Sequence, residues 1–228
     1  MKTQIRFGII GCGAISAKHV KAILDNPNAE LVAACDTNTE LAEKIAKQTG
    51  CKAYTDYQEL LKDKDVDVVS VCTPNGLHAE MSIAALEAGK HVLCEKPMTL
   101  SLLEAERVVE ANNKSGKKFF LVKQNRYNPP IVALKELFKN GQLGHVFLIN
   151  ATVYWNRNDE YYDAVDWRGT RRMDGGALFT QSSHFLDLML WLGGEAKSVF
   201  AVMKNAAHKN TETEDLGVII VKFKNGAI

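Results

Sequence analysis

The chain has 228 residues, a formal net charge of +1 and 46% hydrophobic residues, as an ordinary globular protein does. This balance creates no overall field for nucleic acid or a membrane surface, so we expect neither as a partner. No apolar run approaches the roughly 20 residues of a membrane-spanning helix, and Met1–Arg6 does not resemble a secretory signal. The five cysteines are an odd number without a Cys-x-x-Cys pair, which is typical of reduced thiols in a cytoplasmic protein.

The first half of the chain alternates strand and helix signals. Short apolar runs that suit parallel strands buried on both faces lie at Ile5–Ile10, Leu31–Cys35, Val66–Cys72, His91–Cys94 and Phe119–Val122. Amphipathic stretches with helical spacing lie between them, at Ile15–Leu24, Leu41–Gln48, Leu77–Ala88 and Leu102–Asn112. This alternation predicts an α/β fold with a doubly wound parallel sheet, a Rossmann domain.

The pattern changes near Lys123, and we place a domain boundary there, between residues 1–122 and 123–228. The predicted helices of the second part are Ile131–Lys139 and Ser183–Leu192. Its predicted strands are His145–Trp155, Ala196–Asn205 and Leu216–Phe223. This composition predicts an α+β domain with a mainly antiparallel sheet.

The end of the chain carries a strand followed by a turn. Leu216–Phe223 precedes Asn225-Gly226, a dipeptide typical of hairpin turns. The chain stops at Ile228, where the next strand is expected, so we expect the second domain to be truncated at its C-terminus. An open sheet edge of this kind favours a homo-oligomer, a dimer or tetramer, through the second-domain sheet.

A dinucleotide-binding pattern follows the first predicted strand. The segment Gly11–Ser16 fits Gly-x-Gly-x-x-small, in which Gly11 permits the tight turn and Gly13 lets a pyrophosphate approach the backbone. The helix that follows would offer its free N–H groups to the phosphates. Asp36 ends the second strand, where a carboxylate binds the ribose hydroxyls and repels a 2′-phosphate, so we expect NAD rather than NADP. The expected contacts in this region are Gly11, Gly13, Ala14, Ile15 and Asp36.

Three further motifs accompany the glycine turn. They are the segment Thr73–His78, the tripeptide Glu95-Lys96-Pro97, and Gly175-Gly176-Ala177-Leu178 leading to His184-Phe185-Leu186-Asp187. Together these motifs resemble the Gfo/Idh/MocA family of nicotinamide-dependent oxidoreductases over essentially the whole chain. The resemblance implies an NAD-binding first domain and a second domain for substrate binding and oligomerisation. Members of that family are longer, which agrees with a truncated chain.

A narrower resemblance lies in the second domain. Arg126–Pro130, Glu160–Asp163 and Trp167–Thr170 look like the branch of the family that oxidises UDP-N-acetylglucosaminuronic acid (UDP-GlcNAcA) at its 3-hydroxyl. That branch serves diamino-sugar synthesis for bacterial surface polysaccharides. Many family members carry an Asp four residues before the histidine, but here that position is Thr180. The branch shares this departure, so a Lys–Asp–His mechanism is not carried over whole.

The resemblance assigns the chemistry to Lys96 and His184. Oxidising an alcohol sends a hydride to the nicotinamide and a proton to a base, and His184 suits the base because its unperturbed pKa is near ~6.5. Lys96 follows a parallel strand and could donate to the reacting oxygen, with the two domains bringing it close to His184. Asp187 either supports His184 or faces solvent, and His78 is expected to be a structural helix-start residue. The residues expected to line the nicotinamide half of the cofactor site are Thr73, Pro74, Asn75, Glu95 and Lys96.

A nucleotide-sugar acid carries a diphosphate and a carboxylate, which guanidinium groups bind in bidentate fashion. The expected substrate contacts are Arg126, Tyr127, Arg157, Tyr162, Trp167, Arg168, Thr180 and Gln181. Any one of these arginines taken alone is more typical of a surface charge, and the aromatic residues are equally compatible with a core. The remaining histidines lack metal-ligand spacing, so we expect no metal.

Other functions stay open at this point. A different dehydrogenase of the same family could act on an inositol, a free sugar or a dihydrodiol, and only the motifs between Arg126 and Thr170 argue against it. A catalytically silent NAD-sensing regulator is opposed by the presence of both Lys96 and His184. A scaffolding fragment is suggested only by the expected truncation.

Overall fold

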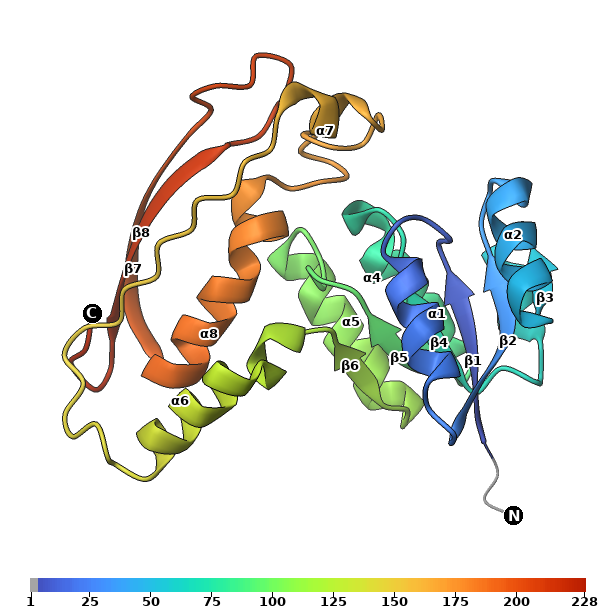
Figure 1. Cartoon of the computed structure of the whole chain (residues 1–228), viewed down its shortest axis with the longest axis horizontal. Helices are drawn as coiled ribbons and strands as arrows, with labels where there is room; N and C mark the ends of the chain where they lie inside the picture. The colour runs from blue at the N-terminus through green and yellow to red at the C-terminus, as the bar shows by residue number, and fades with distance from the viewer. Residues whose placement is uncertain (1–3) are drawn as a thin grey trace. The chain divides into compact units, whose positions relative to one another are not determined.

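The computed structural model describes residues 4–228, which form two compact units that meet between Val122 and Lys123. The first unit contains a six-stranded sheet and the second a two-stranded sheet (Figure 1). All pairings in the first sheet are parallel, and the pairing in the second is antiparallel. The predicted fold class, a doubly wound parallel sheet followed by an antiparallel one, is therefore confirmed.

In the first unit the strands follow the order β3-β2-β1-β4-β5-β6. They are β1 (Ile5–Ile10), β2 (Ala29–Cys35), β3 (Lys52–Tyr54), β4 (Val68–Val71), β5 (His91–Cys94) and β6 (Phe119–Leu121). The helices are α1 (Ser16–Leu24), α2 (Thr39–Thr49), α3 (Tyr57–Lys62), α4 (His78–Glu87) and α5 (Leu102–Ser115), with a short turn η1 (Asn75–Leu77). The strand order reverses between β1 and β4, and a doubly wound sheet binds ligands at the carboxyl ends of its strands at such a point.

Both faces of this sheet are buried, because successive strand residues point to opposite sides. Ile9 belongs to a core that includes Ile23 of α1 and Ile45 of α2. The next residue, Ile10, belongs to a second core with Leu86 of α4. The strands are continuous apolar runs for this reason. The edge strand β3 and the helix α3 were not predicted, since elements this short and polar carry little periodicity.

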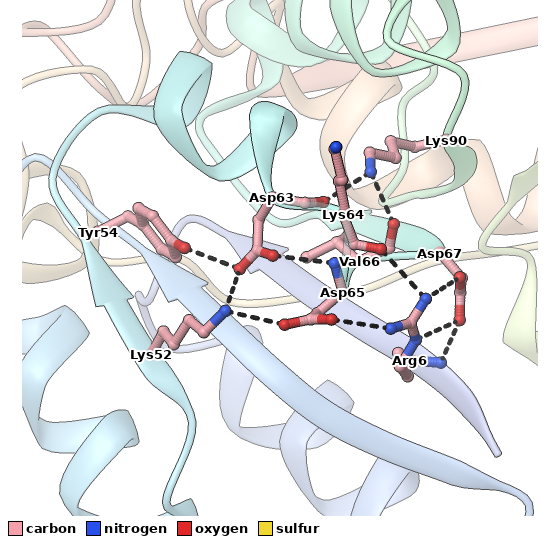
Figure 2. A network of polar contacts seen from close by, with 9 residues as sticks. All are labelled: Arg6, Lys52, Tyr54, Asp63, Lys64, Asp65, Val66, Asp67 and Lys90. Carbon is pink, nitrogen blue, oxygen red and sulfur yellow. Dashed lines mark hydrogen bonds and ion pairs between the residues drawn. The ribbon is translucent and has the colours of Figure 1, made fainter.

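A polar network joins the amino ends of several strands of this sheet (Figure 2). The side chain of Arg6 donates to Asp67 through Nε at 3.0 Å and Nη2 at 2.9 Å. The buried Lys90 donates its Nζ to the backbone carbonyls of Asp63 at 2.7 Å and Val66 at 2.8 Å. The loop between α3 and β4 is thereby fastened at the sheet edge opposite the carboxyl ends.

Protonation of Asp63 at low pH is expected to lower the stability of the first unit. Burial alone would raise the pKa of its carboxyl, but the Asp65 amide, the Lys52 ammonium and the Tyr54 hydroxyl outweigh burial and lower the pKa to about 2. The unfolded pKa is about 4, so the stabilisation is complete above that pH and is lost as the pH falls through about 2. Asp63→Asn should lower the free energy of unfolding by about 2 kcal/mol at neutral pH and flatten its acid dependence.

Urea unfolding followed by circular dichroism at several pH values tests this expectation. Asp25→Asn is the matched control, because Asp25 forms only an exposed ion pair with Lys21, in which the side chains are 62% and 76% exposed. Equal losses in the two variants would contradict the role given to Asp63.

The second unit is organised around α8 and two strands. Its helices are α6 (Pro129–Lys139), α7 (Asp159–Asp163) and α8 (Ser183–Gly193), with short turns η2 (Gln124–Tyr127) and η3 (Leu178–Ser182), and its strands are β7 (Ala196–Lys204) and β8 (Leu216–Phe223). The predicted turn at Asn225-Gly226 is present, with the Gly226 N–H donating to the Phe223 carbonyl at 3.1 Å.

The predicted strand at His145–Trp155 is wrong. Residues 146–158 have no regular secondary structure. The Ile149 N–H donates to the Ile228 carbonyl at 2.8 Å, and the Ile228 N–H donates to the Phe147 carbonyl at 3.0 Å. Alternating side chains create a strand only where a neighbouring backbone pairs with it, and two hydrogen bonds to a single residue do not make a ladder.

The two faces of β8 differ, whereas β7 is exposed along its whole length. Phe223 and Val221 are buried, and Phe223 lies against Gly193 at the end of α8. On the other face, Phe200 pairs with Ile220 and Val202 with Val218. Phe200 and Val218 are 65% and 62% exposed, and their neighbours on this face are also exposed. This outer apolar face (Phe200, Val202, Val218 and Ile220) is of the kind that marks an association surface.

The chain is expected to self-associate through the outer apolar face. Placing a charge in an apolar interface is unfavourable, so Phe200→Lys and Val218→Lys should each shift the protein towards monomer in sedimentation velocity. Asn140→Lys adds the same charge at an exposed polar position of the same unit and should leave the distribution unchanged. A wild-type chain that stays monomeric at high concentration would contradict this expectation.

Candidate active site

The glycine turn after β1 is open where a phosphate would approach. Gly11 has a φ of +92°, and a Cβ there would lie 2.7 Å from the Cys72 backbone, so this position requires glycine. At Gly13 a Cβ would meet nothing within 4 Å, and residues 13–15 are exposed at the beginning of α1. The predicted residues Gly13, Ala14 and Ile15 thus leave space at a helix amino terminus, which suits a pyrophosphate.

Asp36 lies beside this turn at the end of β2. Its Oδ2 accepts the Cys12 N–H at 2.7 Å, and its Oδ1 accepts the Asn38 N–H at 2.8 Å. A carboxylate oxygen has two acceptor positions, so each oxygen retains capacity for a further donor. The pair of hydroxyls on an adenosine ribose fits such acceptors.

The loops that leave β4 and β5 are held together by a buried histidine. His78 begins α4 and is 1% exposed. Its Nδ1 lies 2.6 Å from the Pro97 carbonyl oxygen, and its Nε2 lies 2.9 Å from the Thr73 carbonyl oxygen. Burial lowers the pKa of His78, against the two carbonyl oxygens, which favour the charged ring; a neutral ring donates to only one of them at a time. The structural role expected for His78 is what the structure gives it.

The predicted nicotinamide-side residues occupy these two loops. Thr73, Pro74 and Asn75 follow β4, while Glu95 and Lys96 follow the neighbouring strand β5. Because β4 and β5 are parallel, their carboxyl ends meet at one edge of the sheet. This edge is also the one from which the glycine turn leaves β1.

Glu95 is mostly buried directly after β5, and its predicted place in the cofactor site stays a prediction. It is 8% exposed, its Oε1 lies 2.9 Å from His19 Nε2, and its Oε2 accepts the Lys96 N–H at 3.2 Å. His19 was not predicted as a site residue. Its place three residues after Ser16, on the buried face of α1, was the available signal, but the contact with Glu95 spans 76 residues and no sequence pattern reveals it.

His184 lies in the first turn of α8 and is 6% exposed. The preceding turn η3 has π-helical geometry. This geometry is rare in proteins overall, and where it occurs it is often at a functional site. That turn contains Thr180, whose Oγ1 donates to the Gly176 carbonyl at 2.9 Å, and Gln181. The sequence motif between Gly175 and His184 therefore forms one continuous structural feature.

Arg126 is engaged by the protein itself. Its Nε and Nη2 donate to the two carboxylate oxygens of Asp187, each at 2.7 Å, and its guanidinium lies 5.2 Å from the Trp191 ring centroid. This fork ties η2 to α8, and both oxygens of Asp187, considered as a support for His184, accept from Arg126. The predicted contact of Arg126 with substrate stays a prediction. The neighbouring Tyr127 is 80% exposed.

Two other predicted arginines stack on one tyrosine. The guanidinium carbon of Arg157 lies 4.5 Å from the Tyr161 ring centroid, and that of Arg168 lies 4.1 Å from it. Trp155 flanks Arg157 at 4.8 Å, and Trp167 flanks Arg168 at 5.7 Å. We call these five residues the arginine–aromatic cluster.

The two guanidinium groups of the arginine–aromatic cluster have no carboxylate partner among the described residues. The Nε atoms of Arg157 and Arg168 are buried and have no hydrogen-bond partner among the described residues. Among residues 4–228, neither guanidinium forms an ion pair with a carboxylate. Arg157 also donates to the Gln181 side-chain oxygen at 3.3 Å, which links the cluster to η3. The predicted Tyr162 contacts the cluster edge-on, with its ring centroid 5.2 Å from that of Tyr161, and it also lies 4.7 Å from the ring centroid of His208.

Residues 4–228 contain no group of three or more His, Cys, Asp and Glu side chains that could hold a metal ion. No helix in this part of the chain has both the length and the apolar character needed to cross a membrane.

Solved structures resemble this chain closely. The WlbA dehydrogenase of Chromobacterium violaceum, in complex with NADH and UDP-GlcNAcA, is 39% identical with a TM-score of 0.96 over 98% of this chain and 65% of that one. WlbA from Bordetella pertussis, with the same two ligands, is 38% identical with a TM-score of 0.96 over 100% of this chain and 66% of that one. Among curated sequences, myo-inositol 2-dehydrogenase of Thermotoga maritima is 30% identical over 98% of this chain and 66% of its own length. The chain spans about two thirds of the length of these relatives.

Two family models also match. Residues 5–123 match the model described as an oxidoreductase family with an NAD-binding Rossmann fold, and residues 131–228 match the GFO/IDH/MocA C-terminal domain. The first model covers the glycine turn, Asp36 and Lys96, and the second covers the arginine–aromatic cluster and His184. The chain belongs to the Gfo/Idh/MocA family of oxidoreductases, whose first domain binds NAD.

Proposed function

We propose that the protein oxidises a secondary hydroxyl of a nucleotide sugar, with NAD as the hydride acceptor. The specific substrate proposed is UDP-GlcNAcA, oxidised at its 3-hydroxyl for diamino-sugar synthesis in surface polysaccharides. The arginine–aromatic cluster carries this proposal, because two guanidinium groups without a carboxylate partner suit a substrate with several negative charges.

The reacting hydroxyl would be served by one residue from each unit. His184 accepts the hydroxyl proton, and Lys96 donates to the oxygen as negative charge develops on it. The bound NAD supplies the hydride acceptor. Removing the proton makes the alcohol a better hydride donor, so both residues act in the same step. Asp36 and the open turn at Gly13 hold the cofactor.

The nucleotide and the acid of the substrate would meet the second unit. The diphosphate or carboxylate binds the guanidinium groups of Arg157 and Arg168, and Trp155 or Trp167 offers an aromatic face for the uracil. The 39% identity to WlbA, which was solved with UDP-GlcNAcA, supports this substrate class. We also propose that several copies of the protein associate through the outer apolar face.

A second candidate is oxidation of an uncharged polyol. The 30% identity to a myo-inositol 2-dehydrogenase favours it. A neutral polyol has no negative charge to bind to the guanidinium groups of Arg157 and Arg168. The two candidate functions therefore differ in the charge of the substrate.

Replacing either arginine of the cluster tests the substrate class. Arg157→Gln and Arg168→Gln should each raise KM for UDP-GlcNAcA by about 10-fold or more, because a charge-assisted hydrogen bond to the substrate is lost. KM for NAD should change little, since these residues lie in the other unit. Arg107→Gln, at an exposed position on α5, is the matched control. An unchanged KM for UDP-GlcNAcA, or faster turnover of myo-inositol, would overturn the proposal.

A further inference from the structure

Lys96 stands between two residues that are each fixed by a buried histidine. On one side, His19 Nε2 lies 2.9 Å from Glu95 Oε1. On the other side, His78 Nδ1 lies 2.6 Å from the Pro97 carbonyl oxygen. His78 begins α4, the helix between β4 and β5. His19 belongs to α1, the helix whose amino terminus is expected to receive the cofactor phosphates.

The contact between His19 and Glu95 is sequestered from water. Their side chains are 8% and 10% exposed. His19 shares the buried face of α1 with Ser16 and Ile23, so the helix is seated on the sheet through this histidine. A buried carboxylate is costly unless its oxygens are satisfied, and removing its partner leaves that cost uncompensated.

Both carboxylate oxygens of Glu95 have fixed partners. Oε1 faces His19, and Oε2 accepts the backbone N–H of Lys96 at 3.2 Å. Burial would raise the pKa of Glu95, but His19 and Lys96 outweigh burial and lower the pKa. Glu95 is therefore an ionised bridge, with one oxygen on the cofactor helix and the other on the backbone of the residue proposed for catalysis.

We infer that His19 is a positioning residue, which holds Lys96 in register with the cofactor helix α1 through the carboxylate of Glu95. The inference rests on the proposed function, in that Lys96 is taken as the group that donates to the reacting oxygen. His19 itself touches neither hydroxyl nor hydride. Its contribution is to keep the Glu95-Lys96-Pro97 segment in one conformation when NAD is bound.

Loss of the His19 donor should loosen this segment. In His19→Leu the Glu95 oxygen loses its partner, and small displacements of catalytic groups reduce rates strongly, so kcat should fall about 10- to 100-fold. KM for NAD should change less. His19→Gln carries an N–H donor at a similar distance from the backbone and should recover most of the lost rate. A role limited to filling space predicts the opposite order, because Leu fills an apolar site better than Gln.

Hydrogen–deuterium exchange of the NADH-bound chain, read on peptides covering residues 93–101, tests the inference without any substrate. Exchange there should be faster in His19→Leu and near wild type in His19→Gln. His91→Leu is the matched control, since it removes a histidine that accepts the Lys118 N–H at 2.9 Å within the same unit. Glu95→Gln provides a second route, because an amide cannot accept at both positions, and it should also speed exchange at Lys96.

The outcomes separate this inference from the proposed function. Unchanged exchange in both His19→Leu and Glu95→Gln, or a His19→Gln variant as impaired as His19→Leu, would overturn the inference. If the wild-type chain turns over no nucleotide sugar while exchange responds as expected, the proposed substrate fails and the positioning role stands. If His19→Leu does not fold, exchange in Glu95→Gln decides.

Discussion

Replacing Lys96 with Met is expected to lower kcat by about 100-fold or more, and replacing His184 with Ala should have a similar effect. Each substitution removes one acid–base group from the transition state for alcohol oxidation. NAD affinity should fall little in His184→Ala, because His184 lies outside the NAD-binding Rossmann unit and is proposed to serve the substrate. Because the two groups are proposed to serve one hydroxyl, their effects should be strongly non-additive in the double variant.

Steady-state kinetics beside thermal melts check this prediction. Lys18→Met and His145→Ala are matched controls at exposed positions of the first and second units. A purely structural role for the buried His184 predicts a lower melting temperature with intact turnover per folded molecule. A His184→Ala enzyme that retains more than about half of its turnover would exclude the general-base role. Thr180 and Gln181 would then be the next candidates for a proton path.

The protein is expected to bind NAD more tightly than NADP, and Asp36→Ala should narrow that difference. The carboxylate accepts hydrogen bonds from the ribose hydroxyls, whereas a 2′-phosphate would place like charges together. Loss of hydrogen bonds to a charged group corresponds to a roughly 10-fold or larger weakening of NAD binding. NADP binding should weaken less or improve.

Isothermal titration of both cofactors measures the two affinities directly. Asp36→Asn keeps one acceptor for the Cys12 N–H, which separates distortion of the turn from loss of charge. Asp25→Ala removes an exposed carboxylate from the same unit and should leave both affinities unchanged. Equal or tighter binding of NADP by the wild-type protein would contradict the role of Asp36.

The first sheet could be predicted because each of its main strands is a local pattern. A strand buried on both faces is a continuous apolar run, as at Ile5–Ile10, and the glycine at position 11 is required by a backbone conformation within the same turn. The extended segment at residues 146–158 could not be assigned in this way. Its alternation of side chains resembles a strand, but pairing depends on which backbone lies beside it.

The same distinction between local patterns and distant contacts applies to the candidate site. Gly13, Asp36, Lys96 and His184 were identified from motifs whose members lie close together in the sequence. Pairings between distant residues decide what the other side chains can do. Asp187 accepts hydrogen bonds from two nitrogens of Arg126, which lies 61 residues away in the sequence, and His19 contacts Glu95, which lies 76 residues away. Such contacts engage the side chains of Arg126 and Glu95 within the protein, whereas the Nε atoms of Arg157 and Arg168 have no hydrogen-bond partner among the described residues.

The measurement that tests the central claim most directly is NADH formation by the purified protein with UDP-GlcNAcA as substrate. It should be run beside myo-inositol, UDP-N-acetylglucosamine and NADP in place of NAD. We expect NADH to form with UDP-GlcNAcA and NAD, with a 3-keto sugar nucleotide as the product detected by mass spectrometry. Turnover should be much slower with UDP-N-acetylglucosamine, which keeps the diphosphate but lacks the carboxylate, or with NADP. Faster NADH formation from myo-inositol than from UDP-GlcNAcA would contradict the proposed substrate.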